Sequence, residues 1–373
     1  MTAHVGLPHL HRYATALTFL ALTTTACSAG SDTFDTDTAA ATTTTAPAAS
    51  ASVTASGEPS PTASETARGP VLPGLIAFRR YSIGSESDGT LFSIATDGSH
   101  ERLLVKPPAG TSLEDPDWAP GGGLLYSRIG MADTETHQLV LAGPGGRHPR
   151  LLNPTSPGTL PDGDAADRGV FSPDGRSIAY VRGSGKVTND QLQHVDIWIS
   201  DADGSHRRNL TKGASYSADR NGVAWSPEGS RLVFSLAMSA SGSPANGLAL
   251  FVINADGSGL RRLTPWKLGA GGPPDWSSHD LIAFRAVDDE ESGIGNFFTI
   301  RPDGTHLTQV THFADTVVSH KVSFSPDGRW IAFARSDSAG ANDIYIASID
   351  GKHVYPVIQT HETESSPDWG PVP

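Results

Sequence analysis

The chain has 373 residues, with 27 Lys and Arg against 40 Asp and Glu, and a formal net charge of −13. This acidic balance argues against nucleic acid as a partner, because phosphate binding needs a basic field. The single cysteine, Cys27, excludes an internal disulfide and a thiolate metal cluster.

Residues 1–27 predict a secretory signal peptide. Arg12 precedes an apolar run from Tyr13 to Leu22, which is shorter than the about 20 residues of a membrane-spanning helix. The run ends in "TTAC", which resembles a bacterial lipobox and so implies lipidation of Cys27. The alternative is ordinary cleavage near Ala26 or Ala29. Either way we expect an extracytoplasmic protein, secreted or, as we favour, anchored to the membrane as a lipoprotein.

Residues 28–70 are rich in Thr, Ala, Ser and Pro and contain almost no large apolar residues. Such a segment cannot bury enough surface to offset the entropy of ordering, so the composition predicts a disordered spacer. It is either a tether that holds a folded domain away from a membrane or a linker without that role.

Residues 71–373 contain an internal repeat. "FSPDGRSIAY" at Phe171 returns as "WSPEGSRLVF" at Trp225 and "FSPDGRWIAF" at Phe324. The aromatic residue that opens this motif recurs at intervals of 45 to 54 residues, at Trp118, Phe171, Trp225, Trp276, Phe324 and Trp369. Repeats of this period indicate a propeller or a solenoid.

Each repeat predicts four short β segments separated by turns. "PDG" or a variant joins the first segment to the second, and "DG" joins the third to the fourth in most copies. Four antiparallel strands in each of six copies predict an all-β, six-bladed β-propeller. The first copy lacks its first strand, whereas the chain finishes with an extra one, "SSPDWGPVP". We therefore expect the C-terminal strand to complete the first blade and leave no open sheet edge.

The repeat is similar to that of the TolB-like propellers, whose pattern is roughly "P-x-W-S-P-D-G-x-x-I-A-F … D-I-Y-V-x-D-x-D-G-S-x-x-x-x-L-T". The chain has "RGVFSPDGRSIAYV … DIWISDADGSHRRNLT" and "GVAWSPEGSRLVFS … LFVINADGSGLRRLT". The resemblance covers residues 71–373 and implies the propeller fold. It does not extend to the α/β domain of TolB, which argues against a role in the Tol–Pal system.

Motifs for catalysis are missing from the sequence. It has no G-x-S-x-G and no H-E-x-x-H, so we predict no catalytic residue, no metal site and no cofactor. Related propellers form some polysaccharide lyases. The alternative is therefore a polysaccharide lyase or another glycoside-acting enzyme at the channel mouth, with His320 as the residue to test.

The connections after the second and fourth strands of each blade emerge on one face, where loops of varied sequence can bind a partner. Polar residues just before the first strands are expected to line the channel mouth on that face; they are Glu114, Asp167, Arg168, Arg220, Asn221, His320, Lys321 and Glu364. Trp266 is either an exposed aromatic anchor or packed under its loop. We predict a monomeric, non-catalytic scaffold that binds a protein or a cell-envelope component.

Overall fold

The computed structural model describes residues 69–371 except 86, 132–135, 153–164, 189–190, 213–221, 238–246, 288–293, 315 and 337–339. The chain separates into Met1–Thr62 and Ala63–Pro373, and every described residue belongs to the second unit. The expected signal peptide with Cys27, and the spacer up to residue 68, lie outside the described residues. The described part contains no helix with the length and apolar character needed to cross a membrane.

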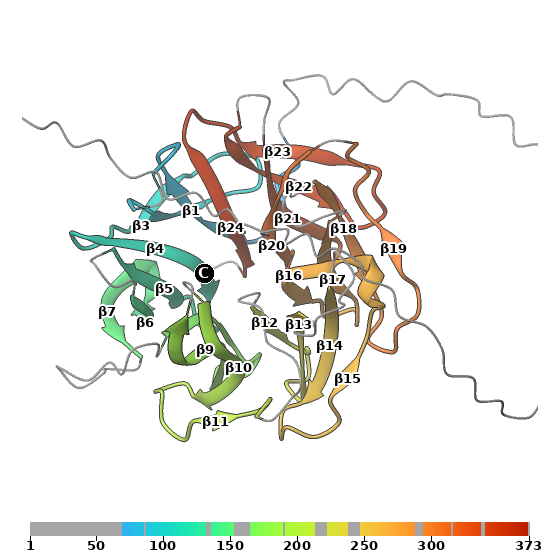
Figure 1. The fold of residues 1–373 in the computed structure, drawn as a ribbon. Coiled ribbons are helices and arrows are strands. Elements are labelled where there is room, and N and C mark those ends of the chain that lie inside the picture. Colours follow the sequence, from blue (N-terminus) through green and yellow to red (C-terminus); the bar gives the residue numbers. More distant parts are fainter. Residues whose placement is uncertain are drawn as a thin grey trace, which may run out of the picture. The chain divides into compact units, whose positions relative to one another are not determined.

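The second unit is a six-bladed β-propeller. Its strands form six four-stranded antiparallel sheets, which stand as blades around a common centre (Figure 1). In blades 2 to 6 the four strands follow one another in the chain from the centre to the rim. The predicted fold class is therefore confirmed.

The first three blades contain the following elements. Blade 1 consists of β24 (Thr363–Gly370), β1 (Leu75–Tyr81), β2 (Thr90–Ile94) and β3 (Arg102–Val105). Blade 2 consists of β4 (Thr111–Trp118), β5 (Leu124–Gly130), β6 (Thr136–Gly143) and β7 (Arg147–Leu151), with the 3-10 helix η1 (Pro144–Gly146) between the last two. Blade 3 consists of β8 (Ala165–Phe171), β9 (Ser177–Thr188), β10 (Gln191–Asp201) and β11 (Arg208–Asn209).

The other three blades follow in the same order. Blade 4 consists of β12 (Val223–Trp225), β13 (Arg231–Ala237), β14 (Leu248–Asn254) and β15 (Arg261–Arg262). The 3-10 helix η2 (Trp266–Leu268) leads into blade 5, which consists of β16 (Ala270–Trp276), β17 (Ile282–Val287), β18 (Gly295–Ile300) and β19 (Thr308–Gln309). Blade 6 consists of β20 (Val318–Phe324), β21 (Trp330–Ser336), β22 (Asn342–Ser348) and β23 (Val354–Ile358).

The two ends of the propeller close the ring. β24 pairs antiparallel with β1, from Leu75 opposite Gly370 to Tyr81 opposite Thr363. The indole Nε1 of Trp369 also donates to the carbonyl oxygen of Pro73 at 3.0 Å. Figure 1 shows β24, in red, beside β1, in blue. The expected completion of the first blade by the C-terminal strand is confirmed.

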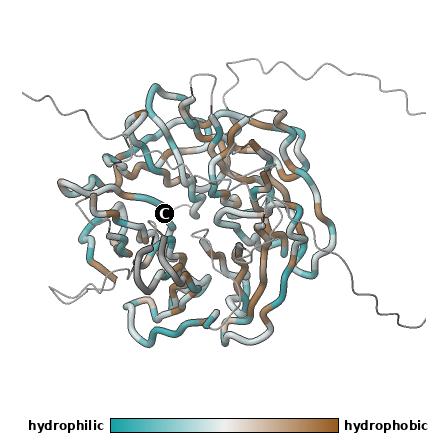
Figure 2. Tube along the Cα trace, in the orientation of Figure 1, coloured by the Kyte–Doolittle hydropathy of each residue, from teal (hydrophilic) through white to brown (hydrophobic). Residues whose placement is uncertain are grey.

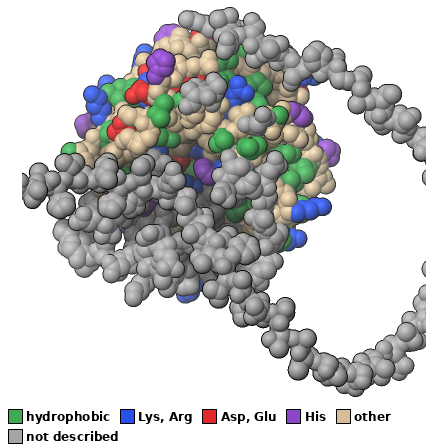
Figure 3. All heavy atoms as spheres, turned by 45° about the horizontal axis from the view of Figure 1, so that its top comes forward, with side chains coloured by type: hydrophobic (Ala, Val, Ile, Leu, Met, Phe, Trp, Pro, Cys, Tyr) green, Lys and Arg blue, Asp and Glu red, His purple; other side chains and the backbone are tan. Residues whose placement is uncertain are grey.

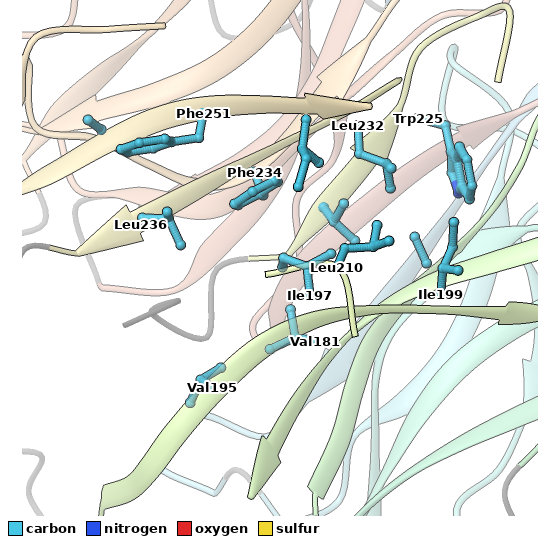
Figure 4. Packing of buried hydrophobic residues seen from close by; sticks show 14 residues of the cluster. Val181, Val195, Ile197, Ile199, Leu210, Trp225, Leu232, Phe234, Leu236 and Phe251 are labelled. Carbon is cyan, nitrogen blue, oxygen red and sulfur yellow. The ribbon is translucent and has the colours of Figure 1, made fainter. Parts of the chain in front are cut away.

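The hydrophobic core is divided among the junctions between neighbouring blades. At the junction of blades 3 and 4, Trp225 packs in one cluster with Ile197 and Ile199 of β10 and with Phe234 of β13 (Figure 4). The repeated aromatic of the other blades lies in the corresponding clusters. Figure 2 shows the apolar segments along the strands and hydrophilic residues at many of the connections. A blade thus buries its two faces only with neighbours on both sides, as in other repeat proteins.

The Asp-Gly turns at the outer hairpins have a simple local cause. At Asp97, Oδ1 accepts the backbone N–H of Ser99 at 2.9 Å, and Gly98 has a φ of 79° that glycine adopts without strain. The same side-chain contact recurs at Asp203, Asp256 and Asp303. These carboxylates thus serve turn formation on the face opposite the channel mouth.

Candidate binding site in the central channel

The innermost strands are bulged where they face the channel. β4, β8 and β24 each contain a register shift against the second strand of their blade. At each shift one non-glycine residue is left-handed: Asp115 with a φ of 46°, Arg168 with 50° and Ser366 with 50°. Such a conformation costs on the order of 1–3 kcal/mol per residue and persists only where the surroundings enforce it.

These three strained residues contact one another, although they come from three blades. Nε of Arg168 lies 3.2 Å from Oδ2 of Asp115. The hydroxyl of Ser366 donates to the other carboxylate oxygen, Oδ1, at 2.8 Å. Three of the eight left-handed non-glycine residues in the described part of the chain thus meet at one point of the channel wall, and strain of this kind gathers at functional sites.

A cavity of about 200 Å³ occupies the channel beside this contact. Carboxylates and cations make up one part of its lining, namely Asp115, Asp117, Asp275, Asp368, Lys321 and Arg168. Apolar residues of blades 3 to 5 make up much of the rest, including Val170, Phe171, Val223, Ala224, Trp225, Pro273, Pro274 and Trp276. In Figure 3, acidic, basic and histidine side chains are visible in the hollow near the middle of the face shown.

Lys321 is the buried cation of this cavity. Its Nζ donates to the carbonyl oxygen of Pro116 at 2.6 Å and lies 3.3 Å from Oδ1 of Asp368. Burial by itself would lower the pKa of Lys321, but Asp368 and then Asp117 outweigh it, so the pKa is raised. The ammonium group therefore stays charged and holds blade 6 to blades 1 and 2.

Side chains just before the repeated aromatic residue link neighbouring blades. Each accepts the backbone N–H of the aromatic residue in the next blade: Asp117 from Phe171 at 3.0 Å, Asp275 from Phe324 at 2.6 Å, Ser323 from Trp369 at 2.9 Å and Asp368 from Trp118 at 2.8 Å. We call these four contacts the interblade clamps. In blades 3 and 4 the corresponding residues are Val170 and Ala224, which cannot form one.

The clamp carboxylates are difficult to ionise. Burial, and then the nearby Asp368, raise the pKa of Asp117 well above its ordinary value. Burial likewise raises the pKa of Asp275 to about 6, against the hydrogen bond from Phe324. Asp117, Asp275 and Asp368 are nevertheless each partly exposed, and all three line the cavity.

Among the residues predicted at the mouth, Glu114 and Asp167 lie within the first strands and not before them. Oε1 of Glu114 is 2.9 Å from Nη1 of Arg79. Burial nevertheless raises the pKa of Glu114 to about 7. Oδ2 of Asp167 is 3.1 Å from Nδ1 of His137. Burial opposes the ionised form of Asp167, but His137 and Arg168 together lower its pKa.

His320 and Glu364 have different surroundings. His320 is exposed, and Nη1 of Arg285 lies 2.7 Å from its Nδ1. The surrounding protein, and then Arg285, lower the pKa of His320, although exposure of the ring to solvent limits this effect. Glu364 is fully buried, and its Oε1 accepts from Nε of Arg80 and from Oγ1 of Thr360, both at 2.7 Å. Glu364 thus fastens β24 to β1 and lies beyond the reach of a partner.

The remaining predicted residues are Trp266, Arg220 and Asn221. Trp266 is partly buried in η2 and packs on Phe251, with 5.7 Å between the ring centroids. The guanidinium of Arg262 lies over the indole, 5.5 Å from its centroid. Trp266 is therefore packed under its loop and is not an exposed aromatic anchor. Arg220 and Asn221 lie outside the described residues.

The residues that sequence reasoning missed are the aspartates of the cavity. Asp117, Asp275 and Asp368 each precede the repeated Trp, so the dipeptide Asp-Trp was a visible signal. Asp115 and Ser366 had no such signal, because only the bulges bring them together. Within the described ranges, no group of three or more His, Cys, Asp or Glu residues is arranged to hold a metal ion.

The fold and the channel place this protein among the TolB-like six-bladed β-propellers in architecture. No family model matches the chain. TolB from Acinetobacter baumannii superposes with a TM-score of 0.58 at 17% identity, over 79% of this chain and 66% of that one. Hydrazine synthase of Kuenenia stuttgartiensis gives a TM-score of 0.60 at 12% identity, over 82% of this chain and 47% of that one. At these identities the likeness shows the fold alone.

By sequence, the chain is similar to the uncharacterized peptidase YuxL of Bacillus subtilis strain 168. The alignment runs over 212 residues at 26% identity, and the match covers 47% of this chain and 31% of the relative. The chain thus spans about a third of the length of the curated relative it matches, and just under two thirds of the TolB chain. Similar propellers occur in proteins with different activities, so function has to be argued from the site.

Proposed function

We propose that this protein is a non-catalytic binding scaffold that engages a protein or another cell-envelope component at the mouth of its central channel. The observation that carries the proposal is the contact of Ser366, Asp115 and Arg168. Three blades each supply a left-handed residue to one charged point beside a cavity. A fold of this type supports a binding role, because a closed ring holds such groups rigidly.

The paired charges at the channel suit recognition by a partner. Glu114 lies against Arg79, and Asp167 against His137. Because these groups are already hydrogen bonded, a partner meets a preformed pattern of donors and acceptors and orders few side chains on binding. Complementary charge on that partner would speed its encounter with the mouth.

The proposed location of the protein is outside the cytoplasm. Residues 1–27 direct export, a lipid on Cys27 anchors the protein, and residues 28–70 hold the propeller of residues 71–373 away from the membrane. The protein acts as a monomer. The signal-like N-terminal sequence and the composition of the spacer support this part of the proposal.

The enzymatic alternative, a polysaccharide lyase or glycoside-acting enzyme, depends on His320. Its Nδ1 is held by the guanidinium of Arg285 at 2.7 Å. No specific observation in the described part of the chain favours this alternative, so it serves as a competing outcome in the test.

A photo-reactive amino acid at position 320 of the full chain, in its native envelope, tests the proposal. Position 306 is the matched control, because His306 is also exposed but lies in a turn on the opposite face. We expect cross-linked envelope adducts from position 320 and few from position 306. Equal adducts from both positions, or none, would contradict the proposal. Turnover of a glycan that is lost in His320→Ala would establish the alternative instead.

A further inference from the structure

We propose that the central cavity binds an organic cation, an ammonium or guanidinium group on a short apolar stem. The charged end lies among the clamp carboxylates and the stem against Trp225. This inference rests on the proposed binding function and specifies the chemistry that the channel selects.

The polarity of the cavity follows from the distribution of the interblade clamps. Asp117, Asp275 and Asp368 lie before the aromatic residue in blades 2, 5 and 1. Val170 and Ala224 take that place in blades 3 and 4, and both line the cavity. The innermost strand of blade 4, β12, is only three residues long. The cavity therefore has a carboxylate wall from blades 1, 2 and 5 and an apolar wall from blades 3 to 5.

The carboxylate wall has unused capacity for a cation. Four aspartates and two cationic residues line the cavity, and Lys321 and Arg168 lie against Asp368 and Asp115. That leaves Asp117 and Asp275, whose pKa values burial raises, and an arriving cation would favour their ionised forms. Oδ2 of Asp115 is buried and accepts no hydrogen bond, although Nε of Arg168 lies 3.2 Å away. Asp115 itself is 7% exposed. An incoming N–H donor with positive charge would supply what this oxygen lacks, and charge-assisted hydrogen bonds are the stronger kind.

The apolar wall and the volume restrict the size of the occupant. Trp225 and Trp276 both line the cavity, and the guanidinium of Arg231 already lies over the Trp276 ring, 4.8 Å from its centroid. Trp225 is therefore the indole against which an alkyl stem or a cation would pack. The cavity volume of about 200 Å³ is smaller than that of pockets for drug-sized ligands, which are roughly 300–1,000 Å³. The occupant is therefore one cationic group with a short stem, either a free amine or a Lys or Arg side chain of a partner segment.

Titration of the full chain with small probes, followed by tryptophan fluorescence and calorimetry, tests the inference. The probes are n-pentylamine, n-pentanol, which lacks the charge, and methylamine, which lacks the stem. A capped glycine pentapeptide with one central lysine represents the side-chain source. We expect n-pentylamine, the peptide or both to bind at least about tenfold more tightly than n-pentanol and methylamine, since tenfold corresponds to 1.4 kcal/mol, about one hydrogen bond.

Two variants and a control make the test specific. Asp275→Asn removes charge but keeps an oxygen for the clamp, and Ala224→Leu fills the apolar wall. Each should weaken binding at least about tenfold. Asp303→Asn, in an exposed turn on the opposite face, should leave it unchanged.

The outcomes separate this inference from the proposed function. Binding of the amine alone identifies a free amine as the occupant, and binding of the peptide alone identifies a side chain. The inference is overturned if no cationic probe binds, if n-pentanol binds as tightly, or if neither variant weakens binding. Adducts at position 320 under those conditions would leave the proposed function standing.

Discussion

Individual charged residues of the central channel differ in how they respond to pH. Burial raises the pKa of Glu114 to about 7, with Asp115 and Asp167 adding to it and Arg79 opposing it. Asp167 lies on β8 of the neighbouring blade, and its pKa is lowered because His137 and Arg168 outweigh the effect of burial. A carboxylate that neutralises near neutral pH therefore lies beside one that keeps its charge.

Replacing Glu114 by Gln should flatten the pH dependence of stability. In the folded protein the pKa of Glu114 is about 7, against 4.5 for an ordinary glutamate. The contribution of Glu114 to the free energy of unfolding is therefore fully present below pH 4.5 and is lost as the pH rises to about 7. That loss is on the order of 3 kcal/mol, at about 1.4 kcal/mol per pKa unit. Urea midpoints between about pH 4.5 and pH 8 measure it.

The control for this prediction is Glu362→Gln, an exposed carboxylate of the same channel face. It should show the pH dependence of the unaltered protein. Some dependence should survive in Glu114→Gln, because Asp275 has a pKa of about 6 and acts in the same direction. An unaltered slope in Glu114→Gln would mean that Glu114 is ionised throughout this range.

Among the structural elements, the innermost strands both build the channel and join the blades. Asp275 shows how a strand does this. Its Oδ1 accepts the N–H of Trp276 at 2.7 Å, and its Oδ2 accepts the N–H of Phe324 in the next blade at 2.6 Å. One side chain thus satisfies two backbone donors near the ring axis, where strand pairing does not reach them.

Asp275→Ala should destabilise the propeller more than Asp275→Asn. Alanine leaves both N–H groups without an acceptor, at a cost of about 1–3 kcal/mol for each. Asparagine keeps one carbonyl oxygen and avoids burying a charge, so its cost should be smaller. The free energy of unfolding by denaturant gives the comparison. If the two variants were equally stable, the clamp would contribute no interblade hydrogen bond of consequence.

The strands themselves were predictable from sequence, whereas the pairing of their charges was not. "PDG" and "DG" are local signals, so they located most of the tight hairpins, and the recurring aromatic residue gave the blade number. The position of Glu364 was misjudged, because its burial depends on Arg80, 284 residues earlier in the chain. Lys321 was expected at the mouth but lies buried, because the bulge of β20 and the carboxylate of Asp368 are features of the closed ring.

For the whole molecule, closure by β24 is what creates the site. β24 supplies Ser366 to the strained contact and Asp368 to the cavity, and its Trp369 fills the junction with blade 6. Without this strand, β1 would expose an unpaired edge and the carboxylate wall would lose a member. The stability of the fold and the candidate binding site should therefore be reduced together.

Thermal unfolding of a chain that ends at Glu362 tests this claim most directly. Loss of the β1–β24 pairing and of the buried Trp369 should cost several kcal/mol and lower the melting temperature by roughly 10 °C or more. A synthetic peptide with the sequence of residues 363–373, added in trans, should restore part of the loss. A truncated chain that melts at the temperature of the full chain would contradict the account.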